Sequence, residues 1–290
     1  ALCEAIAARN GVTRDMVIAG NGSDDILTMV FRAFAAPDLP VAFLDPTYSL
    51  YKVLAAMQEA PVKPIALDAG CDFALPENFP AQAAGANLLI VTRPNAPTGN
   101  SFPLEAMRAI AAEFRGIVMF DEAYADFAED DCMALAAEFS NVIVSRTASK
   151  SFSLAGLRFG YAVAHPEIIA GLNKLKDSYN LDMLTQTLAR AAVRDTGYLA
   201  VTAAKIRESR AFLSAELRHL GFHVVPSQAN FIFAAVPDGD GARAFRFLRE
   251  RALIVRYFPG PVTGAYLRIT VGTPEQNRRL LAALREYTRP

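Results

Sequence analysis

The sequence has little of what nucleic-acid-binding and membrane proteins depend on. Its 290 residues carry 29 lysines and arginines against 30 aspartates and glutamates, and no basic stretch is long enough to follow a phosphate backbone. No apolar run reaches the length of a bilayer span, and no signal peptide is visible. We therefore expect neither a nucleic-acid partner nor a membrane-spanning segment.

Cysteine and histidine are scarce as well. The three cysteines are odd in number and scattered, which favours reduced thiols and a cytoplasmic protein. Among the three histidines, His219 and His223 lie four residues apart, but Gly221 between them is expected to end the helix. We therefore expect no metal site.

Apolar residues are plentiful, at 52% of the chain, which predicts a globular protein with a sizeable core. Over the first 180 residues, short apolar runs alternate with helical patterns. Strands are expected at 41–44, 88–91, 117–120, 142–144 and 159–164, and helices at 24–36, 49–60, 104–114 and 133–139. Continuous apolar runs are typical of parallel strands covered on both faces. This pattern predicts an α/β fold with a large, doubly wound, mostly parallel sheet.

A smaller α+β domain is expected to follow. The predicted elements are helices at 183–194, 198–220, 241–251 and 275–286, and strands at 229–234, 254–256 and 266–271. We therefore divide the chain into a large domain, 1–180, and linking helices with a small C-terminal domain, 181–290. Residues 1–9 read as the middle of an amphipathic helix without a cap, so we expect an N-terminal arm to precede them.

The turn after strand 142–144 is the most informative segment. It is rich in hydroxyls and presents Lys150 and, eight residues later, Arg158. A lysine in this setting can carry a carbonyl cofactor as a Schiff base, while the hydroxyls and the arginine hold a phosphate on the same cofactor. A neighbouring cation also lowers the pKa of a lysine, which a nucleophilic amine needs. Taken alone, the segment equally fits a surface lysine on a loop.

Polar groups also follow two earlier strands, at the sheet edge where open α/β sheets bind ligands. Residues 20–25, after the apolar run 17–19, could cradle an anion with free amides at a helix N-terminus, or could simply cap that helix. Tyr48, after 41–44, could lay its ring on a planar cofactor or serve a structural turn.

The next two strand ends add an amide and an acid. Asn95 lies in the rigid loop 93–99, which could also be an ordinary turn. Asp121 ends the strand 117–120, where a buried carboxylate is costly unless it meets a cation. A protonated pyridine nitrogen would serve, with Tyr124 reaching the ring hydroxyl. The alternative is a structural salt bridge.

These features occur as five motifs in a fixed order. They are Gly-Asn-Gly-Ser-Asp-Asp (20–25), Asp-Pro-Thr-Tyr (45–48), Pro-Asn-Ala-Pro-Thr-Gly (94–99), Asp-Glu-Ala-Tyr-Ala-Asp-Phe (121–127) and Ser-Lys-Ser-Phe-Ser-Leu-Ala-Gly-Leu-Arg (149–158). Their order resembles that of pyridoxal-phosphate-dependent aminotransferases of the aspartate aminotransferase fold, and more narrowly the histidinol-phosphate aminotransferases. Further matches at 176–180, 255–258 and 266–272 extend the resemblance over essentially the whole chain.

The resemblance implies a role for each matched residue. Lys150 would hold pyridoxal phosphate as a Schiff base and then move the proton between substrate and cofactor, while Asp121 would bind the ring nitrogen and Tyr124 the ring hydroxyl. Other implied cofactor contacts are Gly22, Ser23, Asp24, Tyr48, Asn95, Ala123, Thr147, Ser149 and Arg158. Arg268 would clamp a substrate carboxylate, and Arg256 would help to receive a phosphate or distal carboxylate.

The chain departs from the family at one motif. Where many relatives have an asparagine immediately before Pro-Thr-Gly, this sequence has Ala96, with Asn95 one residue earlier. Either Asn95 substitutes or Tyr124 carries the contact with the ring oxygen alone. Asn180 and Asn230 would lie behind the site. The family's N-terminal arm, with a tyrosine that reaches the partner subunit's cofactor phosphate, would precede residue 1.

The function implied is that of a cytoplasmic homodimer, with its active site near the interface, that exchanges amino groups between histidinol phosphate and 2-oxoglutarate in histidine biosynthesis. An aromatic aminotransferase and a phosphothreonine decarboxylase are alternatives, because the reaction depends on which Cα bond lies perpendicular to the cofactor ring. A cofactor-sensing module of a transcription regulator is a third alternative. The two enzyme alternatives share pyridoxal phosphate and small-molecule substrates.

Overall fold

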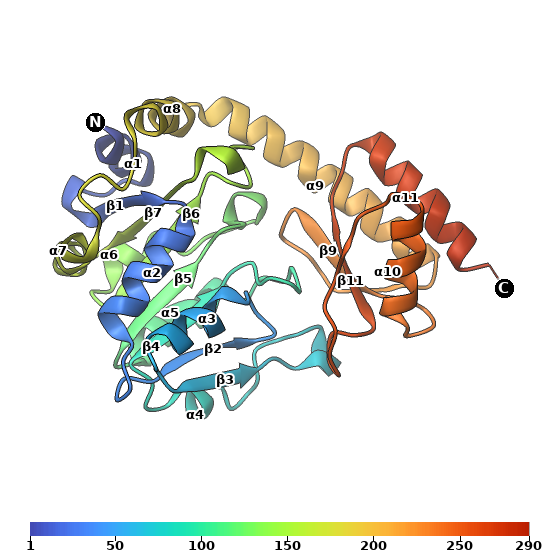
Figure 1. Ribbon diagram of the computed structural model, residues 1–290, viewed down its shortest axis with the longest axis horizontal. Coiled ribbons are helices and arrows are strands. Elements are labelled where there is room, and N and C mark those ends of the chain that lie inside the picture. Colours follow the sequence, from blue (N-terminus) through green and yellow to red (C-terminus); the bar gives the residue numbers. More distant parts are fainter. Residues whose placement is uncertain (290) are drawn as a thin grey trace.

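The computed structural model describes residues 1–289 and contains two sheets (Figure 1). The larger sheet has the strand order β1-β7-β6-β5-β4-β2-β3. Its strands are β1 (Val17–Asn21), β2 (Val41–Asp45), β3 (Val62–Ala66), β4 (Leu88–Thr92), β5 (Ile117–Asp121), β6 (Val142–Thr147) and β7 (Phe159–Ala164). β7 is antiparallel to both of its neighbours, β1 and β6, and the pairs among β2 to β6 are parallel. The prediction of a mostly parallel sheet is confirmed.

Helices cover both faces of this sheet. One face carries α2 (Ser23–Phe34), α3 (Leu50–Met57) and α7 (Pro166–Leu175), and the other α1 (Leu2–Asn10), α4 (Phe79–Ala83), α5 (Leu104–Glu113), α6 (Leu135–Glu138) and α8 (Met183–Arg194). Successive strand residues enter opposite cores, because side chains alternate along a strand: Ile90 packs with the α2 side and Val91 with the α1 side. The sheet is therefore doubly wound, as predicted.

The smaller sheet is antiparallel, with the order β10-β11-β9-β8. Its strands are β8 (His223–Val224), β9 (Phe231–Ala235), β10 (Arg256–Tyr257) and β11 (Tyr266–Thr270), with helices α9 (Thr196–His219), α10 (Gly241–Glu250) and α11 (Pro274–Tyr287). Figure 1 shows the long helix α9 running from the large sheet, beside α8, to the small one. The division at residue 180 stays a prediction.

Several elements differ from the sequence expectation. Strand β3 was not predicted because Lys63 and Pro64 interrupt its apolar pattern; Pro64 is tolerated because β3 is an edge strand. The short strand β8 and the helices α4 and α7 were also not predicted. Helix α6 is shorter than 133–139, and β10 lies at Arg256–Tyr257 instead of 254–256. The remaining short helical turns are η1 (Arg14–Met16), η2 (Ala69–Cys71), η3 (Ala125–Phe127) and η4 (Ala155–Leu157).

The direction of the strands decides where a ligand can lie. Strands β1, β2, β4, β5 and β6 all run the same way, since β1 is antiparallel to the one reversed strand, β7. Their carboxyl ends therefore meet at one edge of the sheet. Over residues 1–289, no helix is long and apolar enough to cross a membrane, and no three His, Cys, Asp or Glu side chains gather as a metal site.

Candidate active site

A cavity of about 230 Å³ lies at this edge of the large sheet. It is lined by Ser23, Asp24, Tyr48, Thr92, Ala96, Asp121, Ala123, Tyr124, Thr147, Ser149, Lys150, Ala155, Arg158 and Arg268. All predicted site residues except Gly22, Asn95 and Arg256 are in this lining. The structure thus brings together side chains from five strand ends and from β11 of the small sheet.

One end of the cavity is shaped to receive an anion. Helix α2 begins here at Ser23, and its N-cap Gly22 provides no side-chain hydrogen bond to the first amides. Arg158 lies opposite, and a Cβ on Gly22 would stand 2.5 Å from Arg158 Nη2. A Cβ on Gly160 would come 2.4 Å from the Ser23 nitrogen, so this close backbone approach requires glycine. Free helix amides and a guanidinium together suit a phosphate.

Asp121 provides a buried acid at the end of β5. Its carboxylate accepts hydrogen bonds from Tyr51 Oη at 2.6 Å, Ser145 Oγ at 3.2 Å and the Ala123 amide, and only 3% of the residue is exposed. Burial raises the pKa of Asp121, while the hydrogen bonds from Tyr51 and Ser145 oppose that rise. A cation in the cavity would stabilise the ionised form, as a protonated ring nitrogen does.

Lys150 stands in the turn after β6, with its side chain open to the cavity. Its Nζ lies 5.7 Å from the centre of the Tyr124 ring. Partial desolvation, followed by the charge of Arg268, lowers the pKa of Lys150. Thr147 fixes the turn, because its hydroxyl donates to the Phe159 carbonyl and accepts from the Ser149 amide. The turn that carries Lys150 is therefore fixed, and its amine is easier to deprotonate than that of a surface lysine.

Two phenols flank the space between Lys150 and Asp121. Tyr48 donates to Asp24 Oδ1 at 3.3 Å, and burial, followed by the charge of Asp24, raises the pKa of Tyr48 to about 12. Burial also raises the pKa of Tyr124. Both hydroxyls therefore stay protonated at neutral pH, and Tyr124 can donate a hydrogen bond to a ring oxygen.

Two arginines lie side by side on the small sheet, and one of them, Arg268, lines the cavity. Arg268 on β11 is directly paired with Arg256 on β10, and both guanidinium groups lie near the Phe258 ring, at 5.4 and 5.8 Å from its centre. Like charges directly opposite each other are destabilising in a sheet. Within residues 1–289, neither forms an ion pair with a carboxylate. This arrangement favours a bound anion.

Asn95 does not take the position predicted for it. Its side chain is fully buried, and Nδ2 donates to the Pro46 carbonyl at 3.0 Å and to Thr98 Oγ1 at 2.7 Å. Ala96 lines the cavity instead. Of the two alternatives for the missing family asparagine, a contact from Asn95 is therefore not favoured, because its loop directs the amide inward. Tyr124, which lines the cavity, is the other residue expected to contact the ring oxygen.

The two asparagines expected behind the site lie outside the cavity lining. Asn180 donates to the Ala19 carbonyl at 2.9 Å and to Asp25 Oδ2 at 3.3 Å, which ties the segment before α8 to β1. Asn230 precedes β9, and its carbonyl accepts from the Val271 amide. Both contacts support the frame of the site and leave the cavity to other side chains.

The sequence reasoning missed three residues beside Asp121: Tyr51, Thr92 and Ser145. A signal for two of them was present. Tyr51 follows Tyr48 by three residues, which places both on one side of a helical turn. Ser145 precedes Thr147 by two residues, which places both on one face of β6.

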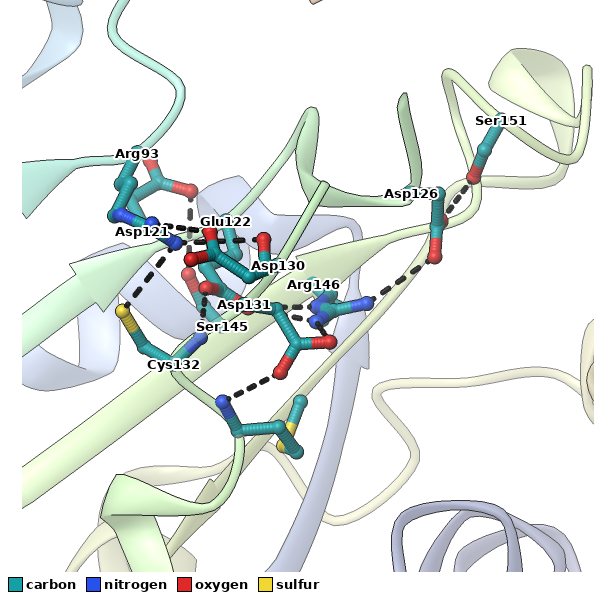
Figure 2. A network of polar contacts seen from close by, with 11 residues as sticks. Arg93, Asp121, Glu122, Asp126, Asp130, Asp131, Cys132, Ser145, Arg146 and Ser151 are labelled. Atoms are coloured by element: carbon teal, nitrogen blue, oxygen red, sulfur yellow. Dashed lines mark hydrogen bonds and ion pairs between the residues drawn. The ribbon is translucent and has the colours of Figure 1, made fainter. Parts of the chain in front are cut away.

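A buried ionic network supports the site from the other face of β6 (Figure 2). Arg146 pairs with Glu122 at 2.7 Å and with Asp126 at 3.1 Å, and Asp126 in turn accepts from Ser151. Asp126 lies two residues beyond Tyr124, and Ser151 directly follows Lys150, so the network joins the two segments that carry these groups. Removing one partner of such a pair leaves a buried charge, which costs about 3–5 kcal/mol.

The donor set as a whole fits pyridoxal phosphate. The anion end suits its phosphate, Asp121 its ring nitrogen, Tyr124 its ring hydroxyl and Lys150 its aldehyde carbon. The family model of aminotransferases of class I and II matches residues 1–284, and the chain belongs to this family. It is a pyridoxal-phosphate-dependent aminotransferase, and pyridoxal phosphate is its cofactor.

Individual relatives show which aminotransferases of this family the chain resembles. The histidinol-phosphate aminotransferase of Syntrophotalea carbinolica is 46% identical over 282 residues, which span 97% of this chain and 80% of the relative. The predicted resemblance to histidinol-phosphate aminotransferases is thereby confirmed. Among solved structures, the Sinorhizobium meliloti histidinol-phosphate aminotransferase in complex with pyridoxal-5'-phosphate has a TM-score of 0.90 at 24% identity, covering 99% of this chain and 80% of that chain.

The fold by itself does not separate reaction types. A decarboxylase from Sulfurospirillum multivorans also has a TM-score of 0.90, at 22% identity, and covers 99% of this chain and 86% of that chain. The assignment of a particular reaction must therefore come from the residues of the site.

Proposed function

We propose that the protein transfers the amino group of histidinol phosphate to 2-oxoglutarate, with its cofactor held covalently by Lys150. The observation that carries the substrate assignment is the pair Arg256 and Arg268, two cations side by side without an acidic partner among the described residues. A phosphate ester carries close to two negative charges at neutral pH, and a guanidinium binds a phosphate or carboxylate in a bidentate way. The same pair can therefore serve both substrates in turn.

The chemistry follows from where the side chains stand. When bound, pyridoxal phosphate supplies an electron sink for the charge that develops at the substrate Cα. Lys150 is placed to take the Cα proton and return it on the cofactor side, and its lowered pKa favours the free amine that this needs. Asp121 would hold a proton on the ring nitrogen, and Tyr124 would donate to the ring oxygen. The anion end of the cavity would hold the cofactor's phosphate.

A half-reaction panel tests the proposed substrates. The absorbance of the bound cofactor is followed after histidinol phosphate, phenylalanine, aspartate or phosphothreonine is added singly to the purified enzyme. Histidinol phosphate should convert the cofactor fastest, and Arg256→Gln should raise its KM by about 10- to 100-fold, the effect of losing one hydrogen bond to a charged group.

The matched control for this panel is Arg249→Gln, an exposed arginine on α10 outside the cavity lining, which should leave KM unchanged. A faster conversion by phenylalanine would assign the enzyme to aromatic amino acids. Release of carbon dioxide from phosphothreonine would replace transamination with decarboxylation. Either result would overturn the proposed substrate.

We also propose that the enzyme is a homodimer, with the active site near the subunit interface. Helix α8 and the segment before it expose large apolar side chains: Tyr179 (95%), Met183 (79%), Leu184 (75%) and Leu188 (55%). Adjacent exposed apolar residues of this kind mark interaction surfaces. Sedimentation analysis should give twice the chain mass of 31.4 kDa, and Leu184→Glu should shift the protein toward the monomer. A wild-type protein of single-chain mass would rule the dimer out.

A further inference from the structure

Three hydroxyls connect Asp121 to the loop that contains Asn95. Tyr51 Oη lies 2.6 Å from Asp121 Oδ2 and 2.8 Å from Thr92 Oγ1. Thr92 Oγ1 lies 3.1 Å from Thr47 Oγ1, which lies 3.4 Å from Asn95 Oδ1. Tyr51 and Asn95 are fully buried and Thr92 nearly so, whereas Thr47 is half-buried, so bulk water is kept from the bond between Tyr51 and Asp121.

The direction of each bond follows from counting protons, since every hydroxyl carries only one. An ionised Asp121 can only accept, so Tyr51 donates to it. Tyr51 must then accept from Thr92, and Thr92 must accept from Thr47. In this order every proton in the chain points toward Asp121.

A protonated Asp121 allows the opposite order. Asp121 then donates to Tyr51, Tyr51 to Thr92, and Thr92 to Thr47, whose proton goes to Asn95 Oδ1. An amide oxygen can only accept, so Asn95 ends the chain. Its amide orientation is fixed because Nδ2 already donates to the Pro46 carbonyl and to Thr98. The order for protonated Asp121 satisfies all four contacts, whereas the order for ionised Asp121 directs the Thr47 proton to Thr92 and leaves the 3.4 Å contact between Thr47 and Asn95 without a proton.

We propose that Tyr51, backed by Thr92 and Thr47, is a positioning residue that keeps Asp121 ionised despite its burial and so sets how tightly the cofactor's ring nitrogen is held. Aligned hydrogen bonds strengthen one another in a low-dielectric interior, so Tyr51 donates more strongly than a lone phenol would. Ser145 adds a second donor from β6. The proposal rests on the role of Asp121 in the proposed function.

Other titratable groups around Asp121 also affect whether its carboxyl group is ionised or protonated. Asp24 disfavours its ionised form by like charge, while Lys150 across the cavity favours it. The phenols Tyr48 and Tyr124 also face it, from the segment after β2 and from the segment after β5. None of these side chains donates a hydrogen bond to Asp121, whereas the bond from Tyr51 is shorter than the one from Ser145. Removing the Tyr51 hydroxyl should therefore have the clearest effect.

Tyr51→Phe removes only that hydroxyl. The pKa of Asp121 should rise by about one to two units, the loss expected for a hydrogen bond to a charged group. In the cofactor-free protein, the infrared band of the protonated carboxyl, assigned by its absence in Asp121→Asn, should appear at correspondingly higher pH. In the holoenzyme, the loss of affinity for pyridoxal phosphate toward acid should begin one to two pH units higher. Thr92→Val should shift both the infrared titration and the acid loss of cofactor affinity in the same direction, but by less.

The matched control is Tyr161→Phe, a buried tyrosine on β7 of the same sheet outside the cavity lining, and it should leave both titrations in place. An unchanged infrared titration in both Tyr51→Phe and Thr92→Val, or an equal shift in the control, would overturn the proposal. The infrared measurement needs neither cofactor nor turnover. A shifted band with unchanged cofactor affinity would therefore refute the role of Asp121 in holding the ring instead.

Discussion

Replacing Lys150 with alanine should abolish amino-group transfer, with kcat lowered by at least about 10⁴-fold, because one side chain supplies both the covalent link to the cofactor and the base for the Cα proton. Lys150 is the only lysine in the cavity lining, so no neighbouring amine can take its place. The variant should still bind pyridoxal phosphate, because the anion end of the cavity and Asp121 remain. Stopped-flow absorbance with glutamate measures the loss.

The control for this variant is Lys52→Ala, which removes an exposed lysine of α3 that pairs with Asp45 outside the cavity lining. Its kcat should stay within about twofold of the wild type, since exposed pairs contribute little. A small primary amine added to Lys150→Ala should restore part of the proton transfer. A Lys150→Ala protein with a cofactor chromophore that glutamate still bleaches would contradict the assignment.

Asp121→Asn should lower kcat by about 10²- to 10³-fold, the usual cost of removing one preorganised electrostatic group. Asparagine keeps the size of the side chain and one of the two oxygens that accept from Tyr51 and Ser145, while its NH2 group takes the place of the other oxygen. The variant loses the negative charge that stabilises a proton on the ring nitrogen. Steady-state rates with saturating substrates measure the effect, and a kcat within threefold of the wild type would argue against this role.

The same Asp121→Asn substitution, which lowers kcat, should raise the stability of the cofactor-free protein. Burial raises the pKa of Asp121 in the folded state above its ordinary value. The protonated side chain thus favours folding at acid pH, and this contribution is lost as the pH rises through the folded pKa. At neutral pH, cofactor-free Asp121→Asn should therefore melt about 2–4 °C higher than the wild type. The difference should vanish at acid pH, and a lower Tm at neutral pH would contradict the sign.

The lower kcat and the higher melting temperature expected for Asp121→Asn have one physical origin. A carboxylate without a cation is costly in a buried place, and the cofactor's ring nitrogen provides that cation. The hydroxyl chain through Tyr51 offsets part of the cost before the cofactor arrives. The site is thus arranged for binding at the expense of the empty protein's stability.

Much of the fold could be predicted because the buried strands appear in the sequence as continuous apolar runs. β4 and β5 show this well, since both faces of each are covered and almost every position is apolar. β3 could not be predicted in this way because an edge strand tolerates Lys63 and Pro64. The shared direction of five strands then explains why residues far apart in the sequence meet in one cavity.

The direction of individual side chains was harder to predict. Asn95 lies in a loop between two prolines, and only the structure shows that its amide points into the protein while Ala96 faces the cavity. Tyr51 was overlooked because a tyrosine inside a helix is usually interpreted as a residue of the hydrophobic core. Its hydroxyl gains meaning only from Asp121, seventy residues later, and no local pattern connects the two.

The residue that carries the cofactor can be identified directly. Borohydride reduction of the holoenzyme makes the link between lysine and cofactor permanent, and digestion followed by mass spectrometry locates the modified peptide. A phosphopyridoxyl group on Lys150 alone is the expected result. The same group on another lysine, or an unmodified Lys150 after complete reduction, would contradict the central claim.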